Sequence, residues 1–395
     1  MPGGRGWKPE EAATKVLTLL PPCGPLAREK PCRSPRRPAI ARARLEIDLD
    51  AIARNWRALG ALSAPGVETA AVVKADAYGL GAAVVAPALA AAGARSFFVA
   101  LAEEGAALRA SLGPGPAIFV FAGLMPGDAG LCAAADLVPC LNSPGQVADF
   151  LRLLPGRRCA LQLDTGMNRL GLEPADLEAI APDLGRLAPV LAISHLACSD
   201  EPDHPLNRAQ AAAMTGLAAR LPGVRLSLAA TGGILLGPAF HFALVRPGIG
   251  LFGGLPFGAG EPVVALSLPV VQVREVARGE AVGYGAAWVA SEPARIATVA
   301  AGYADGLLRA LGDGGFDLFA GAVRCPVVGR ISMDLVTVDV TGLAHVPPAL
   351  DVLGPHQGID DLARAAGTIG YEILTSLGPR YERVYKDGSQ RPDAP

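Results

Sequence analysis

The chain has 395 residues, of which 51% are hydrophobic and 18% are charged. Its charges of both signs are scattered and sum to −2, which excludes the basic footprint expected of a protein that binds nucleic acid or an anionic membrane. No apolar run approaches the ~18 residues of a transmembrane helix. Because single hydrophobic cores rarely grow beyond roughly 300 residues, we expect two domains.

The cysteines favour a reducing compartment. They are odd in number, irregularly spaced and without a CxxC pair, so we expect reduced thiols of a cytoplasmic protein. The only early apolar run, Val16–Leu20, is short and bounded by prolines, unlike a secretory signal. The seven cysteines are Cys23, Cys32, Cys132, Cys140, Cys159, Cys198 and Cys325.

The first forty residues differ in composition from the rest. They hold eight prolines and carry eight Lys or Arg against three Glu, with no sustained periodicity. Such a segment is typical of disorder. We expect residues 1–42 to be a disordered extension outside the fold. The sequence leaves open whether it is a genuine extension, a targeting tail or the product of a start codon assigned too early.

From residue 70 onward the chain repeats a unit of a short apolar run, a polar turn and an Ala/Leu-rich helical stretch. Eight such strands alternating with helices predict a (β/α)₈ barrel of the TIM type, although a doubly wound sheet gives the same alternation. The eight runs are Ala70–Val73, Phe97–Leu101, Ala117–Phe121, Leu137–Leu141, Cys159–Leu163, Val190–Ile193, Leu226–Ala229 and Phe242–Val245.

After about residue 260 the pattern changes to valine-rich runs broken by Gly and Pro. The runs Pro262–Val273, Arg295–Ala300 and Val323–Val340 predict a mostly β second domain. The alternating run Arg44–Leu49, ahead of the first barrel strand, is a candidate to join that sheet. We therefore divide the folded part into a barrel at 43–261 and a β-rich domain at 262–395.

Polar residues follow several of the barrel runs, and barrels build their sites at the C-terminal ends of their strands. Lys74 is the most informative of them. A lysine at such a position is partly desolvated, which favours the neutral amine that condensation with an aldehyde requires. The strand-end residues are Lys74, Arg169, His195, Thr231 and Arg246.

The string AVVKADAYGLG, which contains Lys74 and Tyr78, resembles the cofactor-lysine motif of alanine racemases, enzymes of fold type III that use pyridoxal 5′-phosphate (PLP). AVGYGAAW resembles the catalytic tyrosine motif of the same family, at Tyr284. Racemisation is best served by two bases on opposite faces of Cα. The resemblance assigns these roles to Lys74, for D-alanine, and to Tyr284, for L-alanine.

The resemblance covers roughly residues 43–385 and implies the remaining site residues. Arg246 would contact the pyridine nitrogen of PLP, and His195 would join a hydrogen-bond chain between Tyr284 and Arg246. Arg169 and the backbone at Met333 would recognise the substrate carboxylate. The phosphate would be held by glycine-rich turns, hydroxyls and backbone N–H groups, at Tyr78, Thr231, Gly248, Ile249 and Tyr371.

Three positions depart from the common family pattern. Gln162 stands where many members carry a lysine that becomes carbamylated and orients the arginine. Ala230-Thr231 replaces Asn-Ser, so Thr231 must supply the hydroxyl. Leu80 replaces a histidine at the edge of the lysine motif.

The resemblance also implies a homodimer with shared sites, in which Tyr284 and Met333 come from the partner chain. Other interpretations remain. A non-catalytic PLP carrier has a single barrel, whereas this chain carries a second domain with the GYG tyrosine. A fold type III decarboxylase uses a cysteine of its second domain, where Cys325 lies in an apolar run. A broader amino-acid or serine racemase stays open, as does biosynthesis of D-alanine for peptidoglycan against its catabolism.

Overall fold

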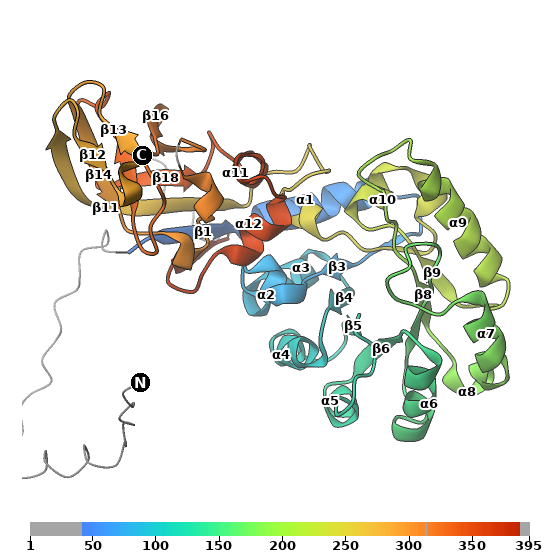
Figure 1. The fold of residues 1–395 in the computed structure, drawn as a ribbon. Helices are drawn as coiled ribbons and strands as arrows, with labels where there is room; N and C mark the ends of the chain where they lie inside the picture. The colour runs from blue at the N-terminus through green and yellow to red at the C-terminus, as the bar shows by residue number, and fades with distance from the viewer. Residues whose placement is uncertain (1–41, 313, 388–395) are drawn as a thin grey trace, which may run out of the picture. The chain divides into compact units, whose positions relative to one another are not determined.

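The structure, a computed structural model, describes residues 42–312 and 314–387 (Figure 1). All described residues belong to one compact unit. The extension proposed at residues 1–42 lies outside them except for Arg42, as do Cys23 and Cys32.

The eight apolar runs form the strands of a closed parallel barrel. The strands β3 to β9 pair in chain order. The final strand, β10, pairs with β2, and β2 is separated from β3 by the single residue Ala70. The ring closes through Ala70 N–H to Val245 O at 2.9 Å and Arg246 N–H to Ala229 O at 2.8 Å. The (β/α)₈ prediction is confirmed, and the doubly wound alternative is wrong because the strand order has no reversal. The strands are β2 (Glu68–Thr69), β3 (Ala71–Val72), β4 (Ser96–Val99), β5 (Ala117–Val120), β6 (Leu137–Leu141), β7 (Ala160–Gln162), β8 (Leu191–Ile193), β9 (Arg225–Ser227) and β10 (Leu244–Val245).

Helices lie on the outer side of these strands (Figure 1). Because both faces of the strands are covered, β6 is buried at every position, which explains the continuous apolar runs. Local signals start the helices: Asp48 caps α1 by accepting from Ala51 N–H at 2.7 Å, and Ser143 caps α6 ahead of Pro144. The helices are α1 (Leu49–Ala61), α2 (Lys74–Tyr78), α3 (Ala82–Ala92), α4 (Ala102–Leu112), α5 (Ala129–Ala134), α6 (Pro144–Leu153), α7 (Pro174–Ile180), α8 (Leu184–Leu187), α9 (Pro205–Ala218) and α10 (Thr231–Leu235).

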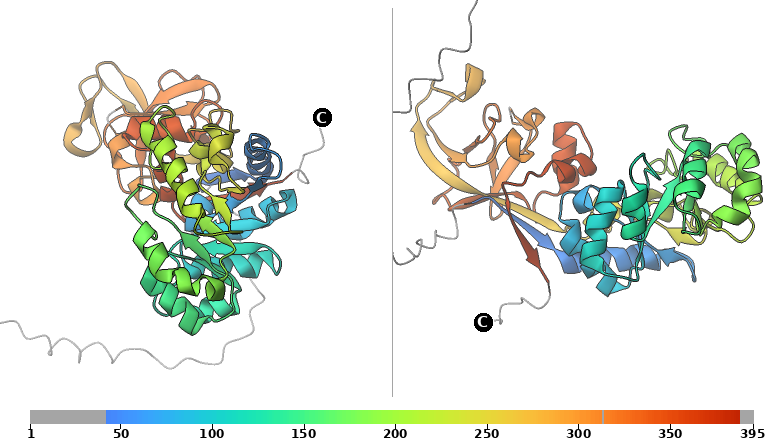
Figure 2. Two further views of the ribbon diagram at one scale, coloured as in Figure 1. Left: turned by 90° about the vertical axis from the view of Figure 1, so that its right-hand side faces the viewer. Right: turned by 90° about the horizontal axis from the view of Figure 1, so that it is seen from below.

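The C-terminal region is mostly β, as predicted, and is organised on the long strand β11 (Figure 2). This strand pairs with β1, β14 and β18. The early run Arg44–Leu49 does join this sheet, because β1 lies between β11 and β19. The strands are β1 (Arg44–Asp48), β11 (Val264–Val276), β12 (Ala281–Val282), β13 (Trp288–Val289), β14 (Ala294–Val299), β15 (Asp317–Ala320), β16 (Val323–Pro326), β17 (Val336–Asp339), β18 (Ala349–Leu353) and β19 (Glu382–Lys386).

The sequence did not predict two helices of this region, α11 (Ile359–Ala366) and α12 (Gly370–Ser376). Asp361 caps α11 by accepting from Gly358 N–H at 2.9 Å, and Ile359 and Leu362 are buried. Because the preceding residues are rich in valine and predict strands, the sequence interpretation did not include these two short helices.

The described cysteines are free thiols. Four of them are buried, and Cys198 is half-buried. Within residues 42–312 and 314–387, every helix is too short or too polar to cross a membrane.

Candidate active site

A cavity of about 1080 Å³ opens at the C-terminal ends of the barrel strands. Helices α11 and α12 contribute to its wall. The polar residues that follow the barrel strands therefore line one shared cavity, as the barrel geometry requires. Nine of the eleven predicted site residues line it: Lys74, Tyr78, Arg169, His195, Thr231, Arg246, Gly248, Ile249 and Tyr371.

Lys74 follows β3 and is half-buried at the cavity. Its Nζ lies 5.7 Å from the centroid of the Phe121 ring. Burial lowers the pKa of Lys74, the positive charge of Arg169 lowers it further, and Glu104 opposes both. The site thus favours the neutral amine of this lysine more than water does.

The chain after Lys74 makes a left-handed turn. Ala75, Asp76, Ala77 and Tyr78 have φ values of 51°, 54°, 54° and 57°. Each non-glycine residue in this conformation costs about 1–2 kcal/mol, so neighbouring contacts must stabilise the turn. They include Ala75 N–H to the Glu104 carboxylate at 2.7 Å and the amide of Gly81 to Asp76 O at 2.9 Å.

Tyr78 and Tyr371 face each other across 5.9 Å between ring centroids. Burial raises the pKa of Tyr371 to about 12, with help from Asp200 and Asp360, and burial raises the pKa of Tyr78 well above its usual range. Both phenols therefore stay neutral at physiological pH. Neutral hydroxyls can donate hydrogen bonds to an anion.

Gly248 leaves room beside the Tyr78 hydroxyl, because a Cβ at this position would collide with that hydroxyl. The Thr231 hydroxyl accepts from Gly248 N–H at 3.2 Å. Backbone amides and hydroxyls thus converge in a cradle with space for a small oxyanion.

Arg246 is buried beneath the cavity. Its guanidinium donates to Ser227 Oγ and to the Ser194 carbonyl, and it lies 5.8 Å from the Phe98 ring centroid. Burial lowers the pKa of Arg246 to about 10, so the group stays cationic at neutral pH. These contacts fix it as a rigid donor aimed at the cavity floor.

His195 lines the same cavity after β8. Burial lowers the pKa of His195 to about 3, and the charges of Arg246, Arg169 and Lys74 add to the effect. The imidazole is therefore neutral. Within the part of the chain that the structure describes, no group hydrogen-bonds to its ring, so the expected chain through His195 to Tyr284 is not formed by one protomer.

Gln210 on α9 holds the strand end that carries His195. Its side chain is fully buried and accepts from Ala197 N–H at 2.8 Å. It donates to the His195 carbonyl at 2.8 Å and to Thr165 Oγ1 at 3.2 Å. One carboxamide thus satisfies three groups from two neighbouring strand ends.

Replacing Gln210 with methionine is expected to lower the free energy of unfolding by about 2–4 kcal/mol, because three polar groups lose their partner. Urea denaturation measures this change. The exposed Gln272, on β11, is the matched control, and Gln272→Met should change stability by no more than about 0.5 kcal/mol. Equal stability of the two variants would show that Gln210 has no such role.

Arg169 lies exposed at the cavity, at the end of a loop after β7. Asp164 organises this loop, since its Oδ1 accepts from the amides of Gly166 at 2.8 Å and Met167 at 3.0 Å. Gln162 also lines the cavity and reaches only the carbonyl of Leu163, at 3.5 Å. Arg169 therefore keeps its guanidinium available to a ligand.

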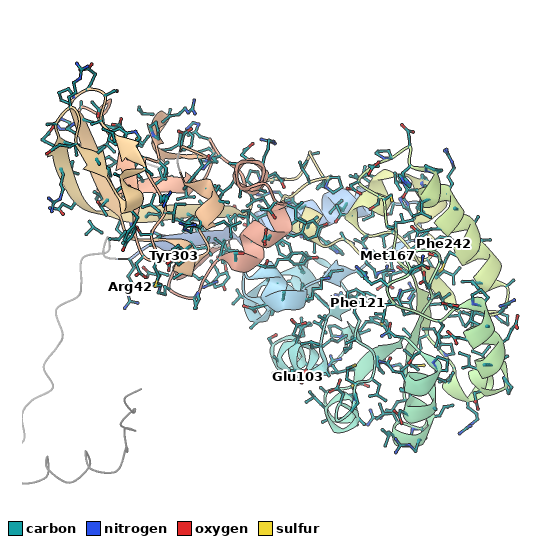
Figure 3. All side chains as sticks on the ribbon, viewed as in Figure 1. Arg42, Glu103, Phe121, Met167, Phe242 and Tyr303 are labelled. Carbon is teal, nitrogen blue, oxygen red and sulfur yellow. The ribbon has the colours of Figure 1, made fainter. Side chains whose placement is uncertain are left out.

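Tyr284 and Met333 lie outside the cavity wall. Their exposed fractions are 70% and 53%. Figure 3 labels Phe121 and Met167 in the barrel and Tyr303 in the β-rich region. Tyr303 and Met333 belong to adjoining backbone, since the amide after Tyr303 donates to Met333 O at 3.0 Å. A single chain does not bring Tyr284 and Met333 to its own cavity.

The cavity also contains residues that the sequence interpretation missed. Phe121 ends the third predicted strand, so the strand-end rule was sufficient to find it. Asp360 and Arg364 come from α11, and only long-range packing places them there. Asp360 Oδ2 accepts from Leu255 N–H at 2.9 Å and so joins α11 to the barrel rim.

Cys325, the candidate for a decarboxylase, lies buried in β16 and outside the cavity wall. Burial raises its pKa. It is a core thiol, and this arrangement gives no support to decarboxylase chemistry at this cavity.

Comparisons with known proteins agree with this geometry. The family model of the alanine racemase N-terminal domain matches residues 47–256, and that of the C-terminal domain matches residues 263–385. An alanine racemase of Cereibacter sphaeroides is 60% identical over 346 residues, which cover 88% of this chain and 99% of that protein. One of Dinoroseobacter shibae is 59% identical over 349 residues, with coverage of 88% and 99%.

Solved structures show the same likeness. Alanine racemase of Bartonella henselae with covalently bound pyridoxal phosphate has a TM-score of 0.83 and 38% identity, covering 88% of this chain and 100% of that one. Biosynthetic alanine racemase of Pseudomonas aeruginosa has a TM-score of 0.81 and 36% identity, with coverage of 88% and 99%. With its barrel, its lysine-bearing cavity and its β-rich second region, this chain belongs to the alanine racemase family.

Proposed function

We propose that the protein interconverts L-alanine and D-alanine with PLP as cofactor, using Lys74 and the Tyr284 of a partner chain as two bases. The observation that carries the proposal is the half-buried amine of Lys74, whose pKa is lowered, beside a cradle of neutral hydroxyls and backbone amides. The covalently bound cofactor of the Bartonella henselae relative supports the choice of PLP.

The residues present fit PLP. The space that Gly248 leaves beside the Tyr78 hydroxyl, next to Thr231, suits a phosphate, and Ile249 and Tyr371 line the same wall. Arg246 would donate to the pyridine nitrogen, and Lys74 would form the covalent link. When bound, PLP withdraws electrons from Cα of the attached amino acid and so acidifies its α-proton.

The protein's own groups would then move the proton. Lys74 Nζ takes or returns the α-proton on one face, and the hydroxyl of the partner's Tyr284 serves the other face. The cationic Arg246 keeps its proton, so it leaves the pyridine nitrogen largely unprotonated and limits side reactions. Arg169 and the Met333 backbone orient the substrate carboxylate.

Shared sites in a homodimer follow from the position of Tyr284. This side chain and Met333 are exposed on the β-rich region and lie outside their own cavity. A second copy of the chain that covers them would complete both cavities at once.

The alternatives are weaker. A PLP carrier with a single barrel lacks the C-terminal domain that residues 263–385 match, and that match supports the division into 43–261 and 262–395. A broader amino-acid or serine racemase would use the same bases. We place the reaction in the cytoplasm, where it would supply D-alanine for peptidoglycan or consume it.

Activity is expected to be independent of added bicarbonate. Gln162 cannot be carbamylated, so carbon dioxide has no group to modify at this position. Initial rates in degassed buffer and in bicarbonate buffer should agree within about 20% when ionic strength is matched. A clear requirement for bicarbonate would contradict this role of Gln162.

Circular dichroism of L-alanine and of D-alanine, each incubated with the protein and PLP, tests the proposed function. Both signals should decay to zero, while L-serine and L-lysine change much more slowly. Equal rates with serine would favour a broader racemase. A bound cofactor without any decay would favour a PLP carrier and overturn the proposal.

A further inference from the structure

Glu104 on α4 joins two loops at the mouth of the cavity. Its Oε1 accepts from Ala75 N–H at 2.7 Å, directly after Lys74. Its Oε2 accepts from the amides of Ala100 at 2.7 Å and Leu101 at 3.3 Å, at the end of β4. One carboxylate therefore ties the residue beside the reactive lysine to the neighbouring strand end.

Helix capping alone does not account for these contacts. As the third residue of α4, Glu104 needs only the Leu101 amide to complete a capping box, and that is the longest of the three bonds. The bond to Ala75 leaves the helix and crosses to a segment 29 residues away. Charged acceptors make stronger hydrogen bonds to backbone amides than neutral ones do.

The segment that Glu104 holds is the strained one. Ala75 is the first of four non-glycine residues in the left-handed region, a conformation that persists only where its surroundings fix it. Other contacts hold the far end of the turn: Arg383 donates to Gly79 O at 3.1 Å, and Tyr385 donates to Leu80 O at 3.1 Å. Glu104 is the side-chain anchor next to Lys74.

The charge of Glu104 acts on the same lysine. Arg169 and His195 line the cavity from the segments that follow β7 and β8, and Tyr371 lines it from α12, which packs on α2. The positive charge of Arg169 lowers the pKa of Lys74, whereas the negative charge of Glu104 raises it. Glu104 therefore holds the backbone beside Lys74 and also limits the lowering of the Lys74 pKa.

We propose that Glu104 is a positioning residue for Lys74, which holds the left-handed turn so that the lysine amine faces Cα of the substrate. The proposal rests on the proposed function for the identity of the reaction. The anchoring of the turn itself is independent of that function and can be measured separately.

Hydrogen exchange by mass spectrometry on Glu104→Ala, with Glu104→Gln and Glu103→Ala beside it, tests the anchoring. Glu103 is the matched control, an exposed carboxylate on the same turn of α4 (Figure 3). In Glu104→Ala, exchange in peptides covering 74–82 should rise by at least about tenfold. Glu104→Gln keeps one acceptor oxygen and should show a smaller rise. If the peptides covering 74–82 exchange in Glu104→Ala at the wild-type rate, the proposal is overturned.

Kinetics with α-deuterated alanine test the effect on Lys74. In Glu104→Ala, kcat should fall by about 10- to 100-fold with little change in KM. The isotope effect should grow for D-alanine, whose proton Lys74 removes, more than for L-alanine. A loss of stability with equal isotope effects in both directions would mean a merely structural role and overturn the proposal. If wild-type protein fails to racemise alanine, the proposed function fails while the exchange result still decides the anchoring.

Discussion

Replacing Lys74 with alanine is expected to lower kcat for alanine racemisation by at least about 10⁴-fold. The change removes the proposed base and, among residues 42–312 and 314–387, the single lysine that lines the cavity. It should also abolish the visible absorbance of lysine-bound PLP. A coupled assay for D-alanine and an absorption spectrum measure both losses.

Lys386→Ala is the matched control. This lysine lies on β19, pairs with Glu46 and keeps 54% of its side chain exposed. Removing a surface ion pair costs at most about 1 kcal/mol, so its kcat should stay within about twofold of wild type. Partial recovery of Lys74→Ala by added methylamine would further support a missing base. Retention of more than a tenth of wild-type kcat in Lys74→Ala would contradict the role of Lys74.

Replacing Tyr284 with phenylalanine is expected to lower kcat by about 10²- to 10⁴-fold, because it removes the hydroxyl that we propose as the acid–base group on the other face of Cα. The ring is 70% exposed in a single chain, so the free energy of unfolding of the protomer should not change. Initial rates from L-alanine, where the Tyr284 hydroxyl would remove the proton, measure the loss.

Tyr381→Phe is the control for removal of a hydroxyl. Tyr381 is buried, and its hydroxyl has no hydrogen-bond partner among the described residues. Its kcat should remain within about twofold of wild type. Equal activity of Tyr284→Phe and Tyr381→Phe would remove Tyr284 from the mechanism.

The sequence predicted the barrel and most of its cavity for a physical reason. Parallel strands are buried on both faces and read as apolar runs, and their ends must meet at one rim. The sequence alone therefore placed Lys74, His195 and Arg246 at the same rim. The roles of these residues rest on the family resemblance and stay a prediction.

Other parts of the site were invisible because no local pattern encodes them. Asp360 and Arg364 reach the cavity only through the docking of α11 on the barrel. The left-handed turn contains Ala, Asp and Tyr, and no glycine marks its first four residues. Glu104 was missed because its partners are backbone amides rather than side chains. These features follow from tertiary contacts and cannot be inferred from spacing alone.

Mixing two inactive variants tests whether each site is shared between two protomers. Lys74→Ala and Tyr284→Phe protomers are combined after verified subunit exchange, and racemisation of L-alanine is followed by circular dichroism. Half of the dimers should be hybrids with one complete site of two, which restores about a quarter of wild-type activity. Activity that stays at the level of the separate variants would contradict a site built by Lys74 of one protomer and Tyr284 of its partner.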